Sequence, residues 1–251
     1  MNFLLCGDKN APPLLLIHGL GCCAERIYGK LARALGKRYR VIMPCLDGHD
    51  PYYETTFDTV ETCCEHIERY ITKNFGGSVY GISGFSLGGT VALALMERGT
   101  IKAQRLHLDG ALCADPGLKK TLYKLYYTKG FQVMAMGIKL PDKVTEFFFG
   151  KGNKDVCDLF EYEVVMPESL ENACRDLYSF KLSPKISECG AAVEYWCGSS
   201  DAPAKKSARK LEGFFPEMRV RVFKDIGHGQ LLREHTKFYY RELRKFLEGK
   251  E

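Results

Sequence analysis

A serine lies between glycines in the segment Ser-Gly-Phe-Ser-Leu-Gly-Gly, residues 83–89. An apolar run, residues 78–82, precedes this segment, and helix-forming residues follow it. A strand that turns abruptly into a helix forces the residue at the turn into a sparsely populated backbone conformation, and flanking glycines remove side chains that would collide there. Ser86 would then stand beside a helix N-terminus, which favours developing negative charge. The G-x-S-x-G spacing of Gly84, Ser86 and Gly88 therefore predicts a nucleophilic serine rather than a simple tight turn.

A nucleophilic serine needs a base, because its hydroxyl is weakly nucleophilic at neutral pH. His228 lies between two glycines in a loop that leaves the last predicted strand, where an imidazole can reach back across the end of a sheet. The other histidines have plainer expected places: His18 ends a strand, His49 lies in a loop, His66 in a helix, His107 inside a strand, and His235 on the inner stripe of the last helix as a packed residue. We therefore predict that His228 is the base.

The base in turn needs an acid that orients it. Asp201 follows the predicted strand 192–197 through Gly-Ser-Ser, at the same edge of the sheet as the serine and the histidine. An aspartate before Ala-Pro could equally cap the helix that follows it. We predict Asp201 as the acid and keep Asp109 and Asp115, which follow the preceding strand, as alternatives.

Ser86, His228 and Asp201 can meet only on a scaffold that brings the ends of several strands together. The pattern of apolar segments predicts such a scaffold. Short apolar runs alternate with helical patterns, which is typical of an α/β fold with a mostly parallel sheet and helices on both faces. The expected strands are residues 14–17, 40–43, 78–82, 105–108, 192–197 and 219–223, with residues 2–6 as a candidate edge strand. Apolar residues recur at helical spacing over 57–71 and 232–246, and we expect both segments to form helices on the sheet.

The alternation is interrupted from about residue 115 to residue 185, where aromatic and apolar patterns are typical of short helices. Pro-Gly and Ser-Pro turn signals border this stretch. We predict a core domain made of residues 1–114 and 186–251, with residues 115–185 inserted as a helical cap. The residues available either to line an apolar pocket under the cap or to form the core of the cap are Phe131, Met134, Met136, Phe147, Phe148 and Phe149.

With these motifs in this order, the chain resembles the α/β-hydrolase family. The matching segments are His18-Gly19 after a strand, residues 84–89, residues 198–201 and residues 227–229. The resemblance covers nearly the whole chain and places the insertion where the family usually carries its cap. It implies that Ser86 is the nucleophile, Asp201 the acid and His228 the base. It also implies an oxyanion hole formed by the backbone N–H groups of Leu20 and Leu87.

One segment departs from the family's pattern. Many relatives read Pro-Gly-His-Gly after the second core strand, whereas this chain has Leu-Asp-Gly-His-Asp at residues 46–50. The departure bears on the substrate more than on the chemistry. The resemblance implies a serine hydrolase that acts through an acyl-enzyme intermediate, and the apolar residues of the insertion lead us to expect carboxylic esters of modest apolar acyl groups as substrates. Thioesters, amides and activated C–C bonds would use the same machinery, and a non-catalytic binding member of the fold is a further alternative.

An alternative of another class comes from residues 19–24, Gly-Leu-Gly-Cys-Cys-Ala, which match the G-x-G-x-x-A fingerprint of dinucleotide-binding folds. That fold needs an acidic residue at the end of the second strand to hold a ribose. Here Pro44 follows the strand, and Asp47 comes three residues later. An NAD(P)-dependent oxidoreductase would also leave Ser86 and His228 without a role. It is therefore the less favoured interpretation, and we expect no organic cofactor or metal.

Length and composition set the remaining expectations. A chain of 251 residues with 45% hydrophobic residues can fill one sizeable core. Its eleven cysteines include no C-x-x-C pair, so reduced thiols and a cytoplasmic location are expected.

From residue 203 onward, the chain has 13 Lys and Arg and 7 Asp and Glu. These charges alternate in sign, as on a solvated helix face, so nucleic acid is not an expected partner. No run approaches the roughly 20 apolar residues of a membrane span. The expected partner is a small-molecule acyl substrate, and the oligomeric state stays open.

Overall fold

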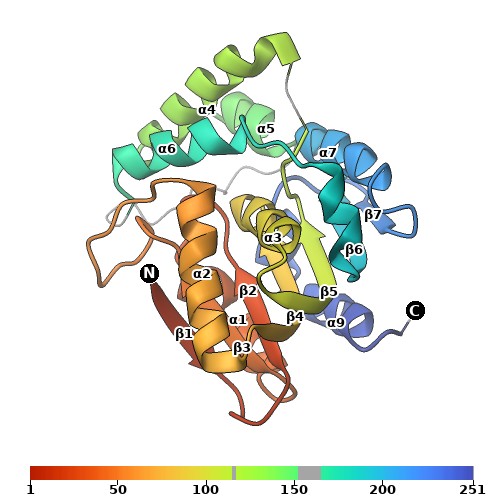
Figure 1. Ribbon diagram of the computed structural model, residues 1–251. Helices are drawn as coiled ribbons and strands as arrows, with labels where there is room; N and C mark the ends of the chain where they lie inside the picture. Colours follow the sequence, from red (N-terminus) through yellow and green to blue (C-terminus); the bar gives the residue numbers. More distant parts are fainter. Residues whose placement is uncertain (115–116, 152–164, 251) are drawn as a thin grey trace.

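The computed structural model describes residues 1–114, 117–151 and 165–250, in which seven strands form one sheet (Figure 1). The strands are β1 (Asn2–Cys6), β2 (Pro13–Ile17), β3 (Arg40–Cys45), β4 (Ser78–Phe85), β5 (Lys102–Asp109), β6 (Ala192–Gly198) and β7 (Arg219–Phe223). Their order is β1-β3-β2-β4-β5-β6-β7. The edge strand β1 runs antiparallel to β3, and every other neighbouring pair is parallel. The predicted fold class is confirmed.

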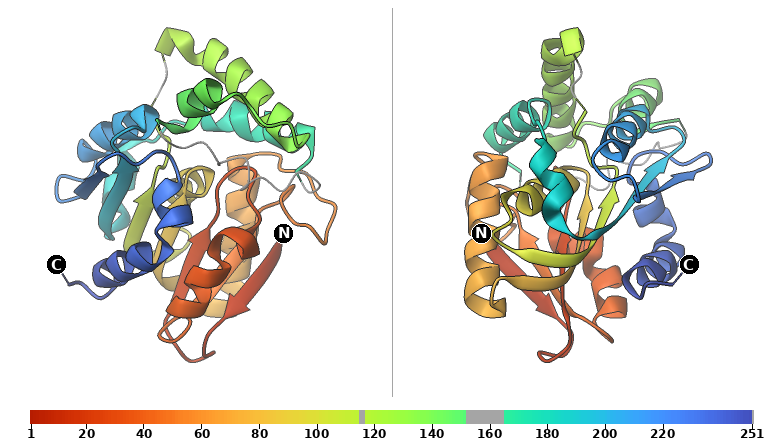
Figure 2. Two further views of the ribbon diagram at one scale, coloured as in Figure 1. Left: turned by 180° about the vertical axis from the view of Figure 1, so that it is seen from behind. Right: turned by 45° about the vertical axis from the view of Figure 1, so that its right-hand side comes forward.

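Helices cover both faces of this sheet. The helices are α1 (Ala24–Leu35), α2 (Val60–Phe75), α3 (Leu87–Arg98), α4 (Lys120–Ala135), α5 (Asp142–Phe149), α6 (Pro167–Leu177), α7 (Ala202–Glu212), α8 (Gln230–Glu234) and α9 (Thr236–Leu247), with 3-10 turns η1 (Gly117–Lys119) and η3 (Pro184–Cys189). One face packs against α2, α3 and α7, and the opposite face packs against α1, α8 and α9. The right-hand view of Figure 2 shows the sheet between α2 on one side and α1 and α9 on the other.

The central strands are buried on both faces, because parallel strands between two helical layers have no solvent side. In β2, Leu14 and Leu16 belong to the core shared with α1 and α9. Leu15 and Ile17 belong to the core shared with α2 and α3. All four side chains are fully buried. Successive side chains of a strand point to opposite faces of the sheet, so one continuous apolar run contributes to both cores.

Each predicted strand lies within an observed one, but the last predicted helix is divided. The apolar spacing over residues 232–246 continues through a break between α8 and α9. At this break His235 has φ −121° and ψ 40°, outside the helical region, and its side chain is exposed. The prediction that His235 packs on the inner stripe of a helix is therefore wrong. Spacing alone does not reveal a break that leaves the apolar residues on one face.

Helices α4, α5 and α6 lie together above the arrowhead end of β5 in Figure 1. They occur between β5 and β6 in the sequence and so form an inserted helical region. α4 packs against α6, and α6 also contacts α2 and α3, which attaches the insertion to the core. The boundaries expected at residues 115 and 185 stay a prediction.

The cysteines do not form a redox pair in the described ranges. No disulfide joins any two of the ten cysteines there, and most of them are buried. Burial raises the pKa of both Cys45 and Cys197 to about 12, so these thiols stay neutral. In the same ranges, the structure has no helix with the length and hydropathy of a membrane span.

Gly88, in α3, and Gly99, directly after α3, test how closely this helix approaches β2. A Cβ at Gly88 would lie 2.1 Å from the Ile17 carbonyl oxygen, whereas a Cβ at Gly99, with φ +69°, would meet nothing within 4 Å. We expect Gly99→Ala to lower the free energy of unfolding by about 1–2 kcal/mol, the cost of a left-handed alanine. Gly88→Ala should lower the free energy of unfolding further, because the backbone at Ile17 or Gly88 would have to move. Urea unfolding of both variants measures the difference, and equal losses would contradict this packing.

Candidate active site

Ser86 occupies the sharp bend between β4 and α3. Its backbone has φ 53° and ψ −117°, a conformation that residues with a Cβ rarely adopt. Gly84 is required beside it, because a Cβ there would lie 2.4 Å from the Gly88 carbonyl oxygen. The Ser86 N–H donates to the Asp109 carbonyl oxygen at 2.8 Å, which attaches the bend to β5. The glycines of the motif therefore permit close packing around a strained residue.

Ser86, His228 and Asp201 form one hydrogen-bonded chain. The Nε2 atom of His228 lies 2.9 Å from Ser86 Oγ, and its Nδ1 atom lies 2.5 Å from Asp201 Oδ2. Because an ionised carboxylate only accepts hydrogen bonds, Nδ1 donates and Nε2 can accept the serine proton. The three residues follow β4, β6 and β7, so parallel strands bring them to one edge of the sheet. An imidazole placed in this way can activate a hydroxyl for attack.

Asp201 uses its two carboxylate oxygens for different contacts. Oδ1 accepts a hydrogen bond from the Ala204 N–H at 3.1 Å, which makes Asp201 the N-cap of α7. Oδ2 accepts from His228. The sequence presented the helix cap and the orienting acid as alternatives, and the structure combines them. The cap fixes the orientation of the carboxylate that faces the imidazole.

The inserted helices and neighbouring backbone hold the His228 loop. The His228 N–H donates to the carbonyl oxygen of Phe149, at the end of α5, at 2.6 Å. The ring centroid of Phe85 lies 5.2 Å from that of the imidazole. A Cβ at Gly110 would approach His228 Cε1 to 2.8 Å, so a larger residue would displace the ring. Sequence reasoning named Phe149 as a cap residue but missed its contact with His228, and it missed Gly110; the glycine directly after a predicted strand was the available signal for Gly110.

The surroundings of His228 set its basicity. Burial lowers the pKa of the imidazole, but the charge and hydrogen bond of Asp201 raise it, and the charge of Asp109 adds to this. The net pKa lies above the ordinary value of 6.5. Because the Asp201 charge favours the imidazolium, it favours proton transfer from Ser86 to His228.

The alternative acids are placed differently from Asp201. Asp109 ends β5 and is 6% exposed, and its Oδ2 atom has no hydrogen-bond partner among the described residues. Burial raises the pKa of Asp109 to about 7, with the charge of His228 opposing this rise. Asp115 lies outside the described residues. Of the acids that the structure describes, Asp201 is the one that forms a hydrogen bond with the imidazole.

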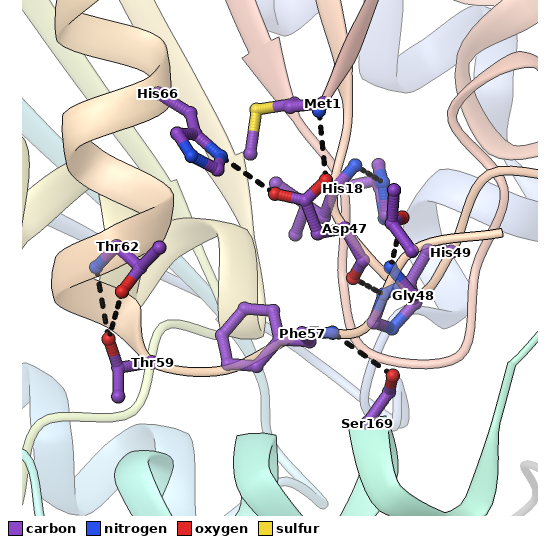
Figure 3. A network of polar contacts seen from close by, with 12 residues as sticks. Met1, His18, Asp47, Gly48, His49, Phe57, Thr59, Thr62, His66 and Ser169 are labelled. Carbon is purple, nitrogen blue, oxygen red and sulfur yellow. Dashed lines mark hydrogen bonds and ion pairs between the residues drawn. The ribbon is translucent and has the colours of Figure 1, made fainter. Parts of the chain in front are cut away.

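His18 fixes the loop that follows β2. Its Nδ1–H donates to the Gly19 carbonyl oxygen at 2.9 Å, and its Nε2 atom accepts from the Leu46 N–H at 3.0 Å (Figure 3). Burial lowers the pKa of His18 to about 3, so the ring is neutral and both bonds persist at neutral pH. The ring therefore ties the loop that carries Leu20 to the segment after β3. The sequence placed His18 at the end of a strand, but it did not predict the contact of the ring with the Leu46 N–H.

The backbone amide of Leu20 belongs to the loop after β2, and that of Leu87 belongs to the start of α3, next to Ser86. Leu87 begins α3, so its N–H has no acceptor inside the helix. Leu20 lines the cavity at Ser86. Neither N–H donates a hydrogen bond within the described part of the chain. A Cβ at Gly19 would lie 2.8 Å from the Phe85 ring, which shows how closely the two segments approach.

A cavity of about 50 Å³ borders Ser86 and His228. The six aromatic and methionine residues expected in the cap have three different positions. Phe131, Phe148 and Phe149 line the cavity, Met134 is buried in the core, and Met136 and Phe147 are 72% and 60% exposed. Phe131, Phe148 and Phe149 also belong to the same buried core as Met134, so these three residues both line the pocket and form the core of the insertion.

The remaining histidines lie outside this arrangement. His107 is buried in β5, where its Nδ1 atom lies 2.8 Å from Ser83 Oγ, and burial lowers its pKa to about 3. His49 is also buried, and burial lowers its pKa to about 4. His66 lies on α2 and contacts Asp47, which follows β3 (Figure 3). None of these three rings borders the cavity at Ser86.

The contacts of Asp47 and Gly19 disfavour a dinucleotide site. The carboxylate of Asp47, which would have to hold a ribose, lies 2.8 Å from His66 Nδ1 and 2.9 Å from the Met1 amine nitrogen (Figure 3). Gly19 packs against the Ser86 bend. The described ranges also contain no cluster of three or more His, Cys, Asp or Glu side chains that could hold a metal ion.

Comparisons with known proteins agree with this architecture. A model of the α/β hydrolase family matches residues 14–240, and the chain belongs to that family, as its resemblance predicted. A protein from Desulfitobacterium hafniense, assigned to the same family, is 25% identical over 98% of this chain and 100% of its own, with a TM-score of 0.85. A search of curated proteins finds no significant match.

More distant structures share the fold. One, from a study of carboxylesterases of Nitrososphaera gargenis, is 23% identical, covers 98% of this chain and 93% of its own, and has a TM-score of 0.77. A 2-hydroxy-6-oxo-6-phenylhexa-2,4-dienoate hydrolase from Rhodococcus sp. strain RHA1 is 18% identical, covers 97% of this chain and 93% of its own, and has a TM-score of 0.73.

The electrostatic contact between His228 and Asp201 can be tested by titration. We expect the His228 imidazole to titrate above pH 6.5, because the Asp201 charge favours its protonated form. Asp201→Asn removes that charge and should lower the His228 pKa. NMR titration of the imidazole in both proteins measures the shift. An unchanged pKa in the variant would contradict the assignment of Asp201 as the charge partner.

The buried carboxyl of Asp109 should make stability depend on pH. Its pKa in the folded protein, about 7, lies above the ordinary value of 3.8, so its stabilising contribution is present at low pH and is lost as pH rises towards 7. Asp109→Asn cannot ionise. Relative to the wild type, the variant should gain about 2–3 kcal/mol of unfolding free energy between pH 5 and pH 8. Urea unfolding at both pH values measures this gain, and a difference that does not change with pH would refute it.

Proposed function

We propose that this protein is a serine hydrolase that cleaves carboxylic esters of modest apolar acyl groups through an acyl-enzyme intermediate. The observation that carries this proposal is the continuous hydrogen-bonded path from Ser86 Oγ through His228 to Asp201. Membership of the α/β hydrolase family supports it. The strained bend at Ser86 supports it as well, because such strain often accompanies a functional role.

In the first half of the proposed reaction, Ser86 Oγ attacks the substrate carbonyl carbon and His228 Nε2 takes the serine proton. The Asp201 carboxylate stabilises the resulting imidazolium. The N–H groups of Leu20 and Leu87 receive the negative charge that develops on the carbonyl oxygen. Each such preorganised donor typically contributes about 10²- to 10³-fold in rate. The N-terminus of α3, where Leu87 lies, adds a favourable dipole.

The imidazolium then gives its proton to the leaving group, and water completes the reaction. His228 first protonates the leaving oxygen, which breaks the bond between that oxygen and the carbonyl carbon. A water molecule then gives a proton to Nε2 of His228 and attacks the acyl carbon, and collapse of this intermediate restores the Ser86 hydroxyl. The same imidazole therefore acts as base and acid in turn.

The cavity favours a neutral acyl group. Among the described residues, its lining is aliphatic and aromatic apart from Cys22, Ser86, His228 and Asp201, and includes no lysine or arginine to pair with a charged acyl group. An ester is therefore the first candidate substrate. Thioesters, amides and activated C–C bonds remain alternatives, because the same residues would act on them. We also propose a cytoplasmic location, which the ten thiols of the described ranges fit.

Ser86 should be the residue that a fluorophosphonate probe labels, because the probe reacts with an activated serine. We expect Ser86→Ala to abolish labelling and to lower ester turnover by about 10⁴-fold or more without unfolding the protein. Ser83→Ala is the matched control, since Ser83 contacts His107 and lies in the same short segment. Peptide mapping of the labelled protein identifies the site. Labelling of Ser86→Ala, or a label on another residue, would refute the assignment of Ser86, and a wild-type protein that takes no label would favour the non-catalytic alternative.

A further inference from the structure

Two adjoining cavities lie beneath the inserted helices. The inner chamber is the cavity of about 50 Å³ at Ser86 and His228. The outer chamber has about 400 Å³ and is lined on its far side by Ala114, Tyr123, Phe147, Ala202, Lys206 and Ser207. The chambers share the residues Leu112, Tyr127, Leu177, Tyr178 and Pro203. These shared residues are the wall between the chambers.

Two tyrosine rings dominate this wall. The ring centroids of Tyr127, on α4, and Tyr178, at the end of α6, lie 5.2 Å apart. Tyr127 also packs edge-on against Phe148 of the inner chamber, with centroids 4.7 Å apart. Burial raises the pKa of both tyrosines well above its usual range, so neither hydroxyl ionises near neutral pH. The wall is therefore a packed, uncharged aromatic barrier.

The inner chamber limits the size of what can lie on that side of Ser86. Its volume of about 50 Å³ is roughly a third of that of an engineered cavity known to bind benzene, about 150 Å³. Its aromatic lining, Phe131, Phe148 and Phe149, is at least 92% buried. A group of two or three heavy atoms fits such a space, and a long alkyl chain does not.

The order of product release decides which part of the substrate uses each chamber. The leaving group departs first, whereas the acyl group stays on Ser86 until water attacks. The group that departs first needs the side with a path to solvent. The outer chamber has that path, because three residues that line it alone are exposed: Phe147, which is 60% exposed, Ala202 and Lys206.

We infer that the site is built for esters of short acyl groups with bulky apolar leaving groups: the inner chamber holds the acyl group, and the outer chamber holds the leaving group. Tyr127 and Tyr178 set the upper limit on acyl length. This assignment rests on the proposed ester hydrolysis at Ser86. It deepens that proposal by specifying which side of the ester bond is small.

A series of p-nitrophenyl esters tests the inner chamber, because the leaving group is constant while the acyl group grows from acetyl to butyryl to octanoyl. We expect kcat/KM to fall at least about tenfold from acetate to octanoate, the scale of discrimination by a pocket of fixed size. A second series of acetate esters of phenol, 2-naphthol and 4-phenylphenol, corrected for the alkaline hydrolysis rate of each ester, tests the outer chamber. Here kcat/KM should not fall with size.

Substitution of the wall should change the acyl limit. Tyr127→Ala opens the inner chamber to the outer one, and we expect the octanoate-to-acetate ratio of kcat/KM to rise about tenfold or more. Tyr127→Phe keeps the ring and should leave the ratio unchanged. Lys206→Ala, which shortens a side chain on the far side of the outer chamber, should also leave the ratio unchanged. Tyr178→Ala is a second wall variant if Tyr127→Ala does not fold, as judged by circular dichroism.

The outcomes separate this inference from the proposed function. Wild-type protein that cleaves octanoate as fast as acetate overturns the chamber assignment. So does an unchanged ratio in a folded wall variant that fluorophosphonate still labels at Ser86. If Ser86 is not labelled and no ester is cleaved, the proposed function fails, and the chamber assignment fails with it.

Discussion

The hydrogen bond between His228 and Asp201 is the interaction on which the rest of the site depends. It joins two loops that leave β6 and β7, and it turns the Nε2 atom of the ring towards Ser86 after β4. Without Asp201, the ring would lose both its orientation and the charge that raises its pKa. Without His228, a buried carboxylate would lose its charge partner, which is costly in a medium of low polarizability. Geometry and basicity therefore come from one contact.

The sheet and the insertion share the task of holding this contact. Parallel strands bring the three loops to one edge, while the cap of α7 fixes the Asp201 carboxylate. The insertion contributes a carbonyl oxygen, that of Phe149, to the backbone of His228. The insertion also supplies Phe131 and Phe148 to the lining of the cavity at Ser86. The helical region that encloses the cavity is thus also part of the support of the imidazole, and a displacement of α5 would move both.

Local patterns predicted most of the fold and the members of the hydrogen-bonded chain, but they left Asp109 and Asp115 open as alternatives to Asp201. The strands were predictable because apolar runs of four to eight residues between turn signals leave few alternatives. Ser86 was predictable because its strain requires glycines at fixed spacing. The contact of His18 with Leu46 was not predictable, because it depends on the distance between two loops after different strands. His235 was misplaced because an apolar period continues through a helix break.

The sequence by itself determined the strand and helix pattern and the strained bend at Ser86, since these follow from steric limits and side-chain period over a few residues. The tertiary structure alone decided that Asp201 rather than Asp109 bonds to the imidazole, that Phe149 supports the His228 loop, and that a tyrosine wall divides the space above Ser86. The physical reason is range: bond geometry and periodicity act between neighbours in the sequence, whereas a hydrogen bond or a cavity wall depends on distances of a few ångströms between segments separated by tens of residues.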